Sequence, residues 1–346
     1  MIEAVDLFCG VGGLTAGLRG EGVRVLAGYD IDSACEFPYQ ENNDAEFVLK
    51  DVTEVTVDEI RCRYTPGAVR LLAGCAPCQP FSTYNQGRDT SSDRKWPLLD
   101  QFARLIEGTA PDLVTMENVP DVTKHDVYHR FVATLTDRPD PYHVWAGTVS
   151  CADYGLPQRR KRHVLLASRL GPVELISPTH ADRHITVKEA IGALLPVAAG
   201  ESDPIDPLHT ASRLSDINMK RIRASKPDGT WRDWPKRLRA ACHQKASGKT
   251  YPGVYGRMSW DKPSPTMTTL CYGYGNGRFG HPSQDRAITL REAALLQAFP
   301  PDYVFVPPDQ PVHFRTVGRM IGNAVPVRLG EIIAKSLHQH LEQLSR

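Results

Sequence analysis

Two cysteines and a carboxyl group stand where strand-like segments end, and their side chains are suited to chemistry. Cys75 and Cys78 follow a predicted strand over Val69–Gly74, and Glu117 ends a predicted strand over Leu113–Glu117. Because the carboxyl ends of neighbouring parallel strands meet at one edge of a sheet, we expect Glu117 to lie next to Cys78. A thiolate is a nucleophile, and a carboxyl group in a partly apolar setting can donate or share a proton.

The spacing Cys75-x-x-Cys78 is open to three interpretations. It matches half of a zinc site, but no second CxxC or Cys/His pair with metal-ligand spacing occurs elsewhere, so we expect no metal. A thioredoxin-like pair normally opens a helix, which Pro80 disfavours. The third interpretation is a nucleophile on a rigid turn, followed by a polar flap over Thr83–Lys95. Glu117 also has a structural alternative, which is to cap a helix that follows its strand.

A glycine-rich turn, FCGVGG over residues 8–13, follows the first predicted strand. Glycines allow the backbone to approach a ligand closely, but Thr15 stands where the dinucleotide fingerprint G-x-G-x-x-G requires glycine. Acids follow the next two strands, at Asp30 and Asp51, where a carboxylate can accept hydrogen bonds from ribose hydroxyls. These features indicate a nucleoside-bearing cofactor without a required pyrophosphate, and S-adenosylmethionine fits. A tight turn with two surface acids is the alternative.

A run of basic residues, Gln158–Arg162, precedes another predicted strand, His163–Ala167. In an extended segment the side chains of Arg160 and Arg162 point the same way, so two guanidinium groups could enter one pocket. A solvated charge run on an edge strand is the alternative.

Strands that alternate with amphipathic segments must position these groups. This pattern predicts an α/β fold in which βαβ units build a Rossmann-like, mostly parallel sheet. Helices are predicted over Leu14–Arg19, Thr289–Phe299 and Val327–Leu344, and the last should pack back on the first domain. The predicted strands are Ile2–Phe8, Val23–Tyr29, Glu46–Leu49, Val69–Gly74, Leu113–Glu117 and His163–Ala167.

The pattern changes near residue 177 to segments with Pro, Arg and Trp and weak periodicity. We therefore predict three parts. Residues 1–176 form the catalytic and cofactor-binding domain, residues 177–285 form a small irregular domain, and residues 286–346 return to the first domain.

The 346 residues have the composition of a globular protein, with 41% hydrophobic and 23% charged residues and a mean hydropathy of −0.34. This composition excludes disorder and fibrous repeats. No apolar run approaches the roughly 20 residues that span a bilayer, and the N-terminus lacks the features of a signal peptide. We expect a cytosolic protein whose eight cysteines are reduced thiols.

The charge is distributed unevenly. Residues 1–120 carry 10 Lys and Arg against 19 Asp and Glu, whereas residues 213–262 carry 13 against 4. The basic stretch, Arg213–Lys262, indicates a surface for a polyanion, and a solvated helix face is the alternative. Its cations include Lys220, Arg221, Arg223, Lys236, Arg237 and Arg239, while Trp231, Trp234 and Trp260 are predicted to be core or loop anchors.

Six segments in this order resemble the DNA cytosine-5 methyltransferase family of bacterial or phage type. They are DLFCGVGGL, GCAPCQPFS, ENVP, QRRKR, TLREAALLQAFP and GRMIGNAVP. The resemblance covers both ends of the chain and leaves only residues 186–255 without a family motif. It implies an S-adenosylmethionine-dependent methyltransferase fold, with the small domain as the target-recognition domain.

The resemblance also implies the reaction, which is methyl transfer to C5 of a flipped-out cytosine in a specific double-stranded DNA sequence. Cys78 would be the nucleophile that bonds to C6, and Glu117 would contact N3 and the amino group. Arg162, with Arg160 nearby, would hold the target base and support the loop. S-adenosyl-L-methionine would be surrounded by Phe8, Gly10, Gly12, Asp30, Ile31, Asp51, Val52 and Asn323.

Partners and alternatives follow from the same resemblance. We expect a monomer that acts on double-stranded DNA in the nucleoid, without membrane contact, and a cognate restriction endonuclease would act separately. A tRNA cytosine-5 methyltransferase is the first alternative. A catalytically silent DNA-binding relative would lack the cysteine of PCQ or the acid of ENV, and both are present. A nicotinamide oxidoreductase is disfavoured by Thr15.

Overall fold

The computed structural model describes residues 1–77, 97–245, 248 and 251–345, which form two compact units. Unit 1 consists of Met1–Tyr154, Lys161–Thr179 and Ala324–Arg346, and unit 2 consists of Gly155–Arg160 and His180–Asn323. Each unit is therefore built from stretches that are separate in the sequence.

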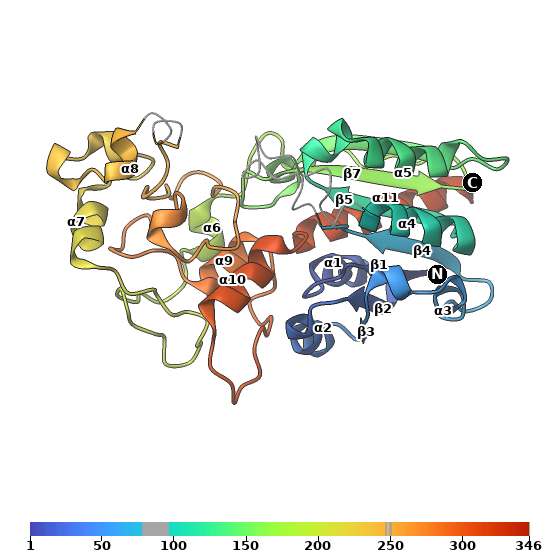
Figure 1. Cartoon of the computed structure of the whole chain (residues 1–346), viewed down its shortest axis with the longest axis horizontal. Helices are drawn as coiled ribbons and strands as arrows, with labels where there is room; N and C mark the ends of the chain where they lie inside the picture. The colour runs from blue at the N-terminus through green and yellow to red at the C-terminus, as the bar shows by residue number, and fades with distance from the viewer. Residues whose placement is uncertain (78–96, 246–247, 249–250, 346) are drawn as a thin grey trace. The chain divides into compact units, whose positions relative to one another are not determined.

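A sheet with the strand order β3-β2-β1-β4-β5-β7-β6 forms the centre of unit 1 (Figure 1). The first five strands in this order pair in parallel, whereas β7 runs antiparallel to both of its neighbours. The predicted α/β fold with a mostly parallel sheet is thus confirmed. The strands are β1 (Ile2–Leu7), β2 (Arg24–Asp30), β3 (Glu46–Leu49), β4 (Val69–Gly74), β5 (Leu113–Asn118), β6 (His143–Ser150) and β7 (Lys161–Ser168).

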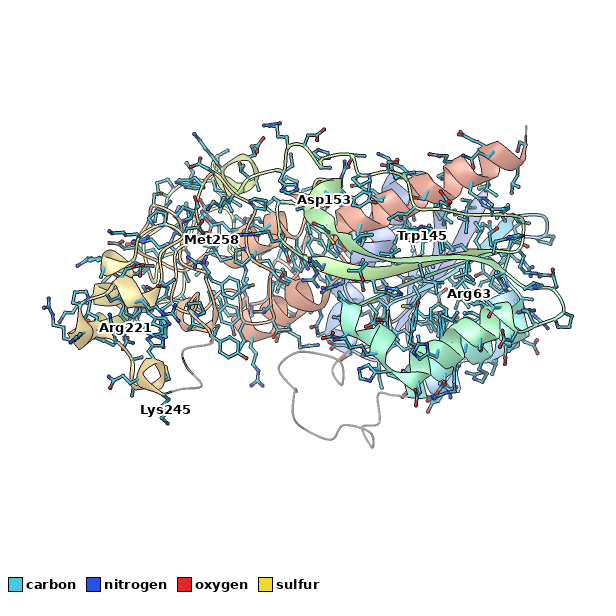
Figure 2. All side chains as sticks on the ribbon, turned by 90° about the horizontal axis from the view of Figure 1, so that it is seen from above. Arg63, Trp145, Asp153, Arg221, Lys245 and Met258 are labelled. Carbon is cyan, nitrogen blue, oxygen red and sulfur yellow. The ribbon has the colours of Figure 1, made fainter. Side chains whose placement is uncertain are left out.

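Helices cover both faces of this sheet, so its central strands are apolar and buried. α4 packs beside α5 on one face, and α11 lies on the other, where it contacts α1 (Figure 2). β1 and β5 are buried over their whole length, as is usual for strands covered on both sides. The helices of unit 1 are α1 (Gly13–Gly20), α2 (Glu36–Asn42), α3 (Val57–Arg61), α4 (Pro97–Thr109), α5 (Asp126–Thr136) and α11 (Val327–Leu344).

Unit 2 is smaller and irregular, with short helices and isolated β-bridges in its described residues. A buried ion pair organises one part of it: Arg286 donates to both carboxylate oxygens of Glu292 at 2.7 Å each. Glu292 also closes a capping box with Thr289. The helices of unit 2 are α6 (Val187–Ile191), α7 (Asp216–Ala224), α8 (Ala241–Gln244), α9 (Leu290–Leu296) and α10 (Phe314–Asn323).

Short 3-10 helices connect these elements in both units. They are η1 (Ser33–Cys35), η2 (Val52–Glu54), η5 (Pro120–Lys124), η6 (Cys151–Tyr154), η7 (Trp231–Asp233), η8 (Lys236–Leu238) and η10 (Tyr274–Asn276). Within the described ranges, no helix combines the length and apolar character needed to cross a membrane.

All six predicted strands are present within one or two residues of their predicted ends, and the helix over Val327–Leu344 has the predicted bounds. The prediction missed β6 and specified no helix at α2 to α8 or at α10. It also placed the return to the first domain at residue 286, whereas the chain re-enters unit 1 at Ala324. The reason is packing, because α9 contacts α6 and α10 within unit 2.

Candidate active site

The carboxyl edge of the unit 1 sheet gathers those predicted site residues of the unit that the structure describes. β1, β2, β3, β4 and β5 are parallel, so the residues that follow them come to one edge of the sheet. Because β7 is antiparallel to β5, its first residues reach the same edge. A cofactor region after β1, β2 and β3 and a catalytic region after β4 and β5 are thus neighbours.

Glu117, on β5, is the buried acid of the catalytic region, with 3% of its surface exposed. Arg162 Nε lies 2.7 Å from Glu117 Oε1 in an ion pair. The register explains this contact, because Glu117 is opposite Val164 and Arg162 is two residues further along the same face of β7. Oε1 receives no aligned hydrogen bond among the described residues, so it keeps hydrogen-bonding capacity beside the guanidinium group.

Two hydrogen bonds tie the segment after β4 to the end of β5. Cys75 Sγ donates to Glu117 Oε2 at 2.8 Å, and Asn118 Nδ2 donates to the carbonyl oxygen of Ala76 at 3.2 Å. Sequence reasoning missed both contacts, although the predicted proximity of these two strand ends pointed to them. Cys78 and the flap over Thr83–Lys95 lie outside the described residues, so the predicted position of Cys78 beside Glu117 stays a prediction.

A buried histidine lies beneath the catalytic region. His163 is opposite Asn118 in the sheet, and its Nε2 is 2.8 Å from Tyr128 Oη. Burial lowers the pKa of His163, while the charge of Glu117 acts in the opposite direction. The imidazole ring is therefore neutral near pH 7.

The expectation that the Arg160 and Arg162 side chains enter one pocket stays a prediction, and the described contacts of the two residues differ. The two residues belong to different units, and a tight turn in which Arg160 N donates to Gln158 O ends the extended backbone. The Arg160 guanidinium group is buried and donates to the carbonyl oxygens of Met267 and Gly322 at 3.1 and 3.3 Å. Arg160 therefore connects segments of unit 2.

The turn after β1 has an unusual backbone in the cofactor region. Phe8, Gly10 and Gly12 have φ angles of 58°, 52° and 85°, which lie in the left-handed region. A Cβ on Gly12 would come within 2.5 Å of Asn43 Nδ2, whereas a Cβ on Gly10 would meet no atom of the described residues within 4 Å. The turn thus packs tightly at Gly12 and faces open space at Gly10.

Asp30, at the end of β2, holds this turn in place. Its Oδ2 accepts from Gly10 N at 2.8 Å, and its Oδ1 accepts from Asp32 N at 2.9 Å. Burial raises the pKa of Asp30, although these backbone donors act against the shift. Each carboxylate oxygen can accept a second hydrogen bond, so Asp30 can also receive ribose hydroxyls.

The remaining predicted cofactor residues fall into three environments. Ile31 is an apolar side chain that is 69% exposed beside Asp30, where it could cover an adenine ring. Asp51 accepts a hydrogen bond from Thr53 N and caps η2, whereas Val52 is buried in the core of unit 1. Asn323 is an exposed residue at the end of α10 in unit 2, and its predicted cofactor contact stays a prediction.

The open space at Gly10, the polar Asp30 and the exposed Ile31 together fit an adenosine group. An acid suits ribose hydroxyls, and an apolar side chain suits a purine ring.

The basic stretch Arg213–Lys262 lies within unit 2 and includes α7, η7, η8 and α8. Trp231 and Trp234 are buried in a cluster with Leu238, which confirms their prediction as core anchors. Arg221, labelled in Figure 2, donates from Nε to Leu238 O and lies 5.3 Å from the ring centre of Tyr255, so it supports this cluster.

A family model, described as C-5 cytosine-specific DNA methylase, matches residues 2–339 of the chain. The chain is 51% identical to the Type II methylase M.HgiDII of Herpetosiphon aurantiacus, with 99% of this chain and 97% of that protein covered. It is 30% identical to the Type II methyltransferase M.Eco47II of Escherichia coli, with 99% and 80% covered.

The fold has counterparts among solved structures. The methyltransferase EhMeth of Entamoeba histolytica is similar with a TM-score of 0.72 and 15% identity, and the similarity covers 99% of each chain. This structural similarity shows the fold alone. The family is shown by the family model and by the relatives that match in sequence.

Proposed function

Because the chain belongs to the C-5 cytosine-specific DNA methylase family and is a DNA cytosine-5 methyltransferase, we propose that it methylates a flipped-out cytosine through a transient covalent bond to Cys78. The observation that carries this proposal is the buried Glu117 carboxylate, which Arg162 and Cys75 contact at the carboxyl edge of the sheet. Glu117 is on β5, which lies two strands from β1 in the sheet, and β1 leads into the turn at Gly10.

The reaction requires a nucleophile, an acid and a cation, since cytosine C5 is a poor nucleophile by itself. The Cys78 thiolate forms a bond to C6, and the electron pair of the C5–C6 double bond shifts into the ring toward N3. Glu117 shares a proton with N3, and Arg162 offsets the negative charge that develops there. C5 then has enamine character and would accept the methyl group that the bound cofactor supplies. Loss of the C5 proton to a base, return of the N3 proton to Glu117 and release of the Cys78 thiolate then restore the C5–C6 double bond.

The cofactor of this proposal is S-adenosylmethionine, whose sulfonium group supplies an electrophilic methyl group when bound. Asp30 would accept the ribose hydroxyls, Ile31 would cover the adenine ring, and Asp51 would contribute a second acid. The turn at Phe8, Gly10 and Gly12 would let the backbone approach the cofactor, and Asn323 of the GNAV motif would complete the site.

The substrate of this proposal is double-stranded DNA at a specific sequence. A stacked base cannot present C6 to a thiolate, so the nucleotide has to rotate out of the duplex, at a cost of a few kcal/mol. The exposed cations of the basic stretch, among them Lys236 and Arg237, would neutralise phosphates. One chain carries the proposed nucleophile, acid and cofactor turn, so a monomer suffices, and any cognate endonuclease acts as a separate protein.

Two experiments test the proposal in sequence. Bisulfite sequencing of DNA from cells that express the protein identifies the modified cytosine and its sequence context. A duplex with 5-fluorocytosine at that position should then form a stable covalent adduct with the protein in the presence of S-adenosylmethionine, because fluorine at C5 cannot leave as a proton does.

The variant Cys78→Ser should form no adduct and transfer no methyl groups while it still binds the duplex. Methylation of tRNA in place of duplex DNA would refute the proposed substrate. Methyl transfer by Cys78→Ser at the normal rate would refute the covalent mechanism.

A further inference from the structure

Cys75 is a second sulfur in the catalytic region, and the covalent chemistry does not use it. We propose that Cys75 is a positioning residue that fixes the Glu117 carboxyl group for the reaction. This inference rests on the proposed function of Glu117 as the acid that addresses N3 and the amino group of cytosine.

The geometry gives each oxygen of Glu117 its own neighbour. Arg162 Nε, from the start of β7, is 2.7 Å from Oε1, and Cys75 Sγ, from the end of β4, is 2.8 Å from Oε2. A glutamate side chain has a freely rotating terminal bond, so one contact leaves the plane of the carboxyl group undetermined. Two contacts from two different strands determine that plane.

The thiol contact is compatible with substrate binding. A carboxylate oxygen accepts more than one hydrogen bond, so Oε2 can receive the Cys75 thiol and an amino group of the base together. A thiol is a weak neutral donor, so it orients the carboxylate without forming a second ion pair. Glu117 is 3% exposed, and water therefore replaces the thiol poorly.

Two hydrogen bonds that do not involve the Cys75 side chain hold the backbone of this segment. Cys75 N donates to Leu7 O at 3.2 Å, and Asn118 Nδ2 holds the carbonyl oxygen of Ala76. A substitution that removes only the sulfur should therefore leave the path of the chain after β4 unchanged. The rate of methyl transfer then reports on the carboxyl group itself.

The first test compares the variants Cys75→Ala and Cys75→Ser with the unmodified protein in single-turnover methyl transfer to duplex DNA. Loss of one weak donor to a charged group should lower the rate about three- to tenfold in Cys75→Ala. Serine keeps a donor, so Cys75→Ser should stay within about twofold of the unmodified protein. The KM for DNA and the affinity for S-adenosylmethionine should stay the same in both variants. Cys62→Ala, which removes an exposed thiol at the end of α3, is the matched control and should show no change.

The second test asks whether Cys75 acts through Glu117. In a Glu117→Gln background the thiol has no carboxylate to orient, so adding Cys75→Ala should lower the residual rate no further. An equal loss in both backgrounds, or a rate of Cys75→Ala within twofold of the unmodified protein, would overturn the inference. An unmodified protein that transfers no methyl groups to DNA would instead overturn the proposed function on which the inference rests.

Discussion

At the scale of single residues, Arg160 and Arg162 are two arginines close in the sequence whose side chains make different contacts. Arg162 is the second residue of the antiparallel strand β7 and contacts the buried carboxylate of Glu117. Arg160 precedes that strand, and its guanidinium group binds two backbone carbonyls of unit 2. The contacts of each arginine depend on where β7 begins. The rule that every second side chain points the same way applies only to residues within the strand.

The two arginines should therefore differ when each is substituted. Arg160→Met leaves two buried carbonyl oxygens without this donor and should lower the free energy of unfolding by about 2–4 kcal/mol. Arg162→Gln removes the cation beside Glu117 and should lower the single-turnover rate by about 100-fold. Urea unfolding and single-turnover methyl transfer, measured on both variants, give the comparison. A larger loss of rate in Arg160→Met than in Arg162→Gln would contradict these assignments.

The sequence predicts Glu117 and Arg162 as site residues because both stand at predicted strand ends in family motifs. The contact between Cys75 and Glu117 was not predicted, since 42 residues separate them and the register of β4 against β5 is a property of the folded sheet. For Cys75, the sequence disfavoured zinc binding and thioredoxin-like chemistry and indicated no other role. Only its position after β4 placed its sulfur against a carboxylate.

At the scale of elements, the turn between β1 and α1 allows a comparison of two glycines. Both Gly10 and Gly12 have positive φ, and a left-handed backbone costs a non-glycine residue roughly 1–2 kcal/mol. At Gly12 a Cβ also collides with Asn43, whose Nδ2 donates to Tyr39 O. Gly12→Ala should therefore lower the free energy of unfolding by more than about 2 kcal/mol.

Gly10→Ala should act mainly on the cofactor, because the added methyl group meets no atom of the part of the chain that the structure describes. We expect the Kd for S-adenosylmethionine to rise about tenfold or more, with a loss of about 1–2 kcal/mol in stability. Urea unfolding and calorimetric titration separate the two effects. Unchanged cofactor affinity in a folded Gly10→Ala protein would argue against this turn as the cofactor site.

The turn before α9 supports a prediction about pH. His281 Nδ1 accepts from Gln284 N at 2.9 Å, so the ring is a neutral acceptor, and burial lowers its pKa to about 4. Between about pH 6.5 and 4, the unfolded chain binds a proton that the folded chain rejects, so stability falls as the pH falls. The loss should approach about 3 kcal/mol at pH 4 and be absent above pH 6.5.

The variant His281→Asn isolates this contribution, because the asparagine oxygen can accept the same backbone hydrogen bond without titrating. Thermal unfolding between pH 7 and 4.5 should show a shallower loss of stability in this variant than in the unmodified protein. This window lies above the range in which Glu292 takes up a proton, since Arg286 offsets the effect of burial and lowers the pKa of Glu292. Equal slopes for the two proteins would rule out His281 as the source.

The sequence pattern predicts buried elements better than edge elements. Strands covered on both faces are continuous apolar runs, which is why β4 and β5 were predicted almost residue for residue. β6 lies at the edge of the sheet and is mostly half-buried or exposed, so its sequence has no clear apolar period. α10 contains Gly318 and Gly322, which have low helix propensity, and its packing in unit 2 rather than its composition makes it helical.

At the scale of the whole molecule, the acidic N-terminal third and the basic stretch belong to different units. Residues 1–120 lie in unit 1, and residues 213–262 lie in unit 2. A chain with a net charge of +1 thus carries a strongly basic segment that can meet a polyanion. The segmentation itself was hard to predict, because residues 286–323 carry family motifs and still pack in unit 2.

The basic stretch should make DNA binding strongly dependent on salt. Lys236 and Arg237 are exposed on η8, whereas Arg221 is bound to Leu238 O and covers aromatic rings. Each phosphate contact contributes about 0.9 to the slope of log K against log salt, so the double variant Lys236→Ala/Arg237→Ala should reduce that slope by about 2. Arg61→Ala/Arg138→Ala removes the same charge from the last residue of α3 and from the segment after α5 in unit 1, and it should leave the slope unchanged. Fluorescence anisotropy with duplex DNA between about 50 and 200 mM salt measures both slopes. Equal reductions in the two double variants would mean that only the overall charge matters, and the assignment of the basic stretch to phosphate binding would then be wrong.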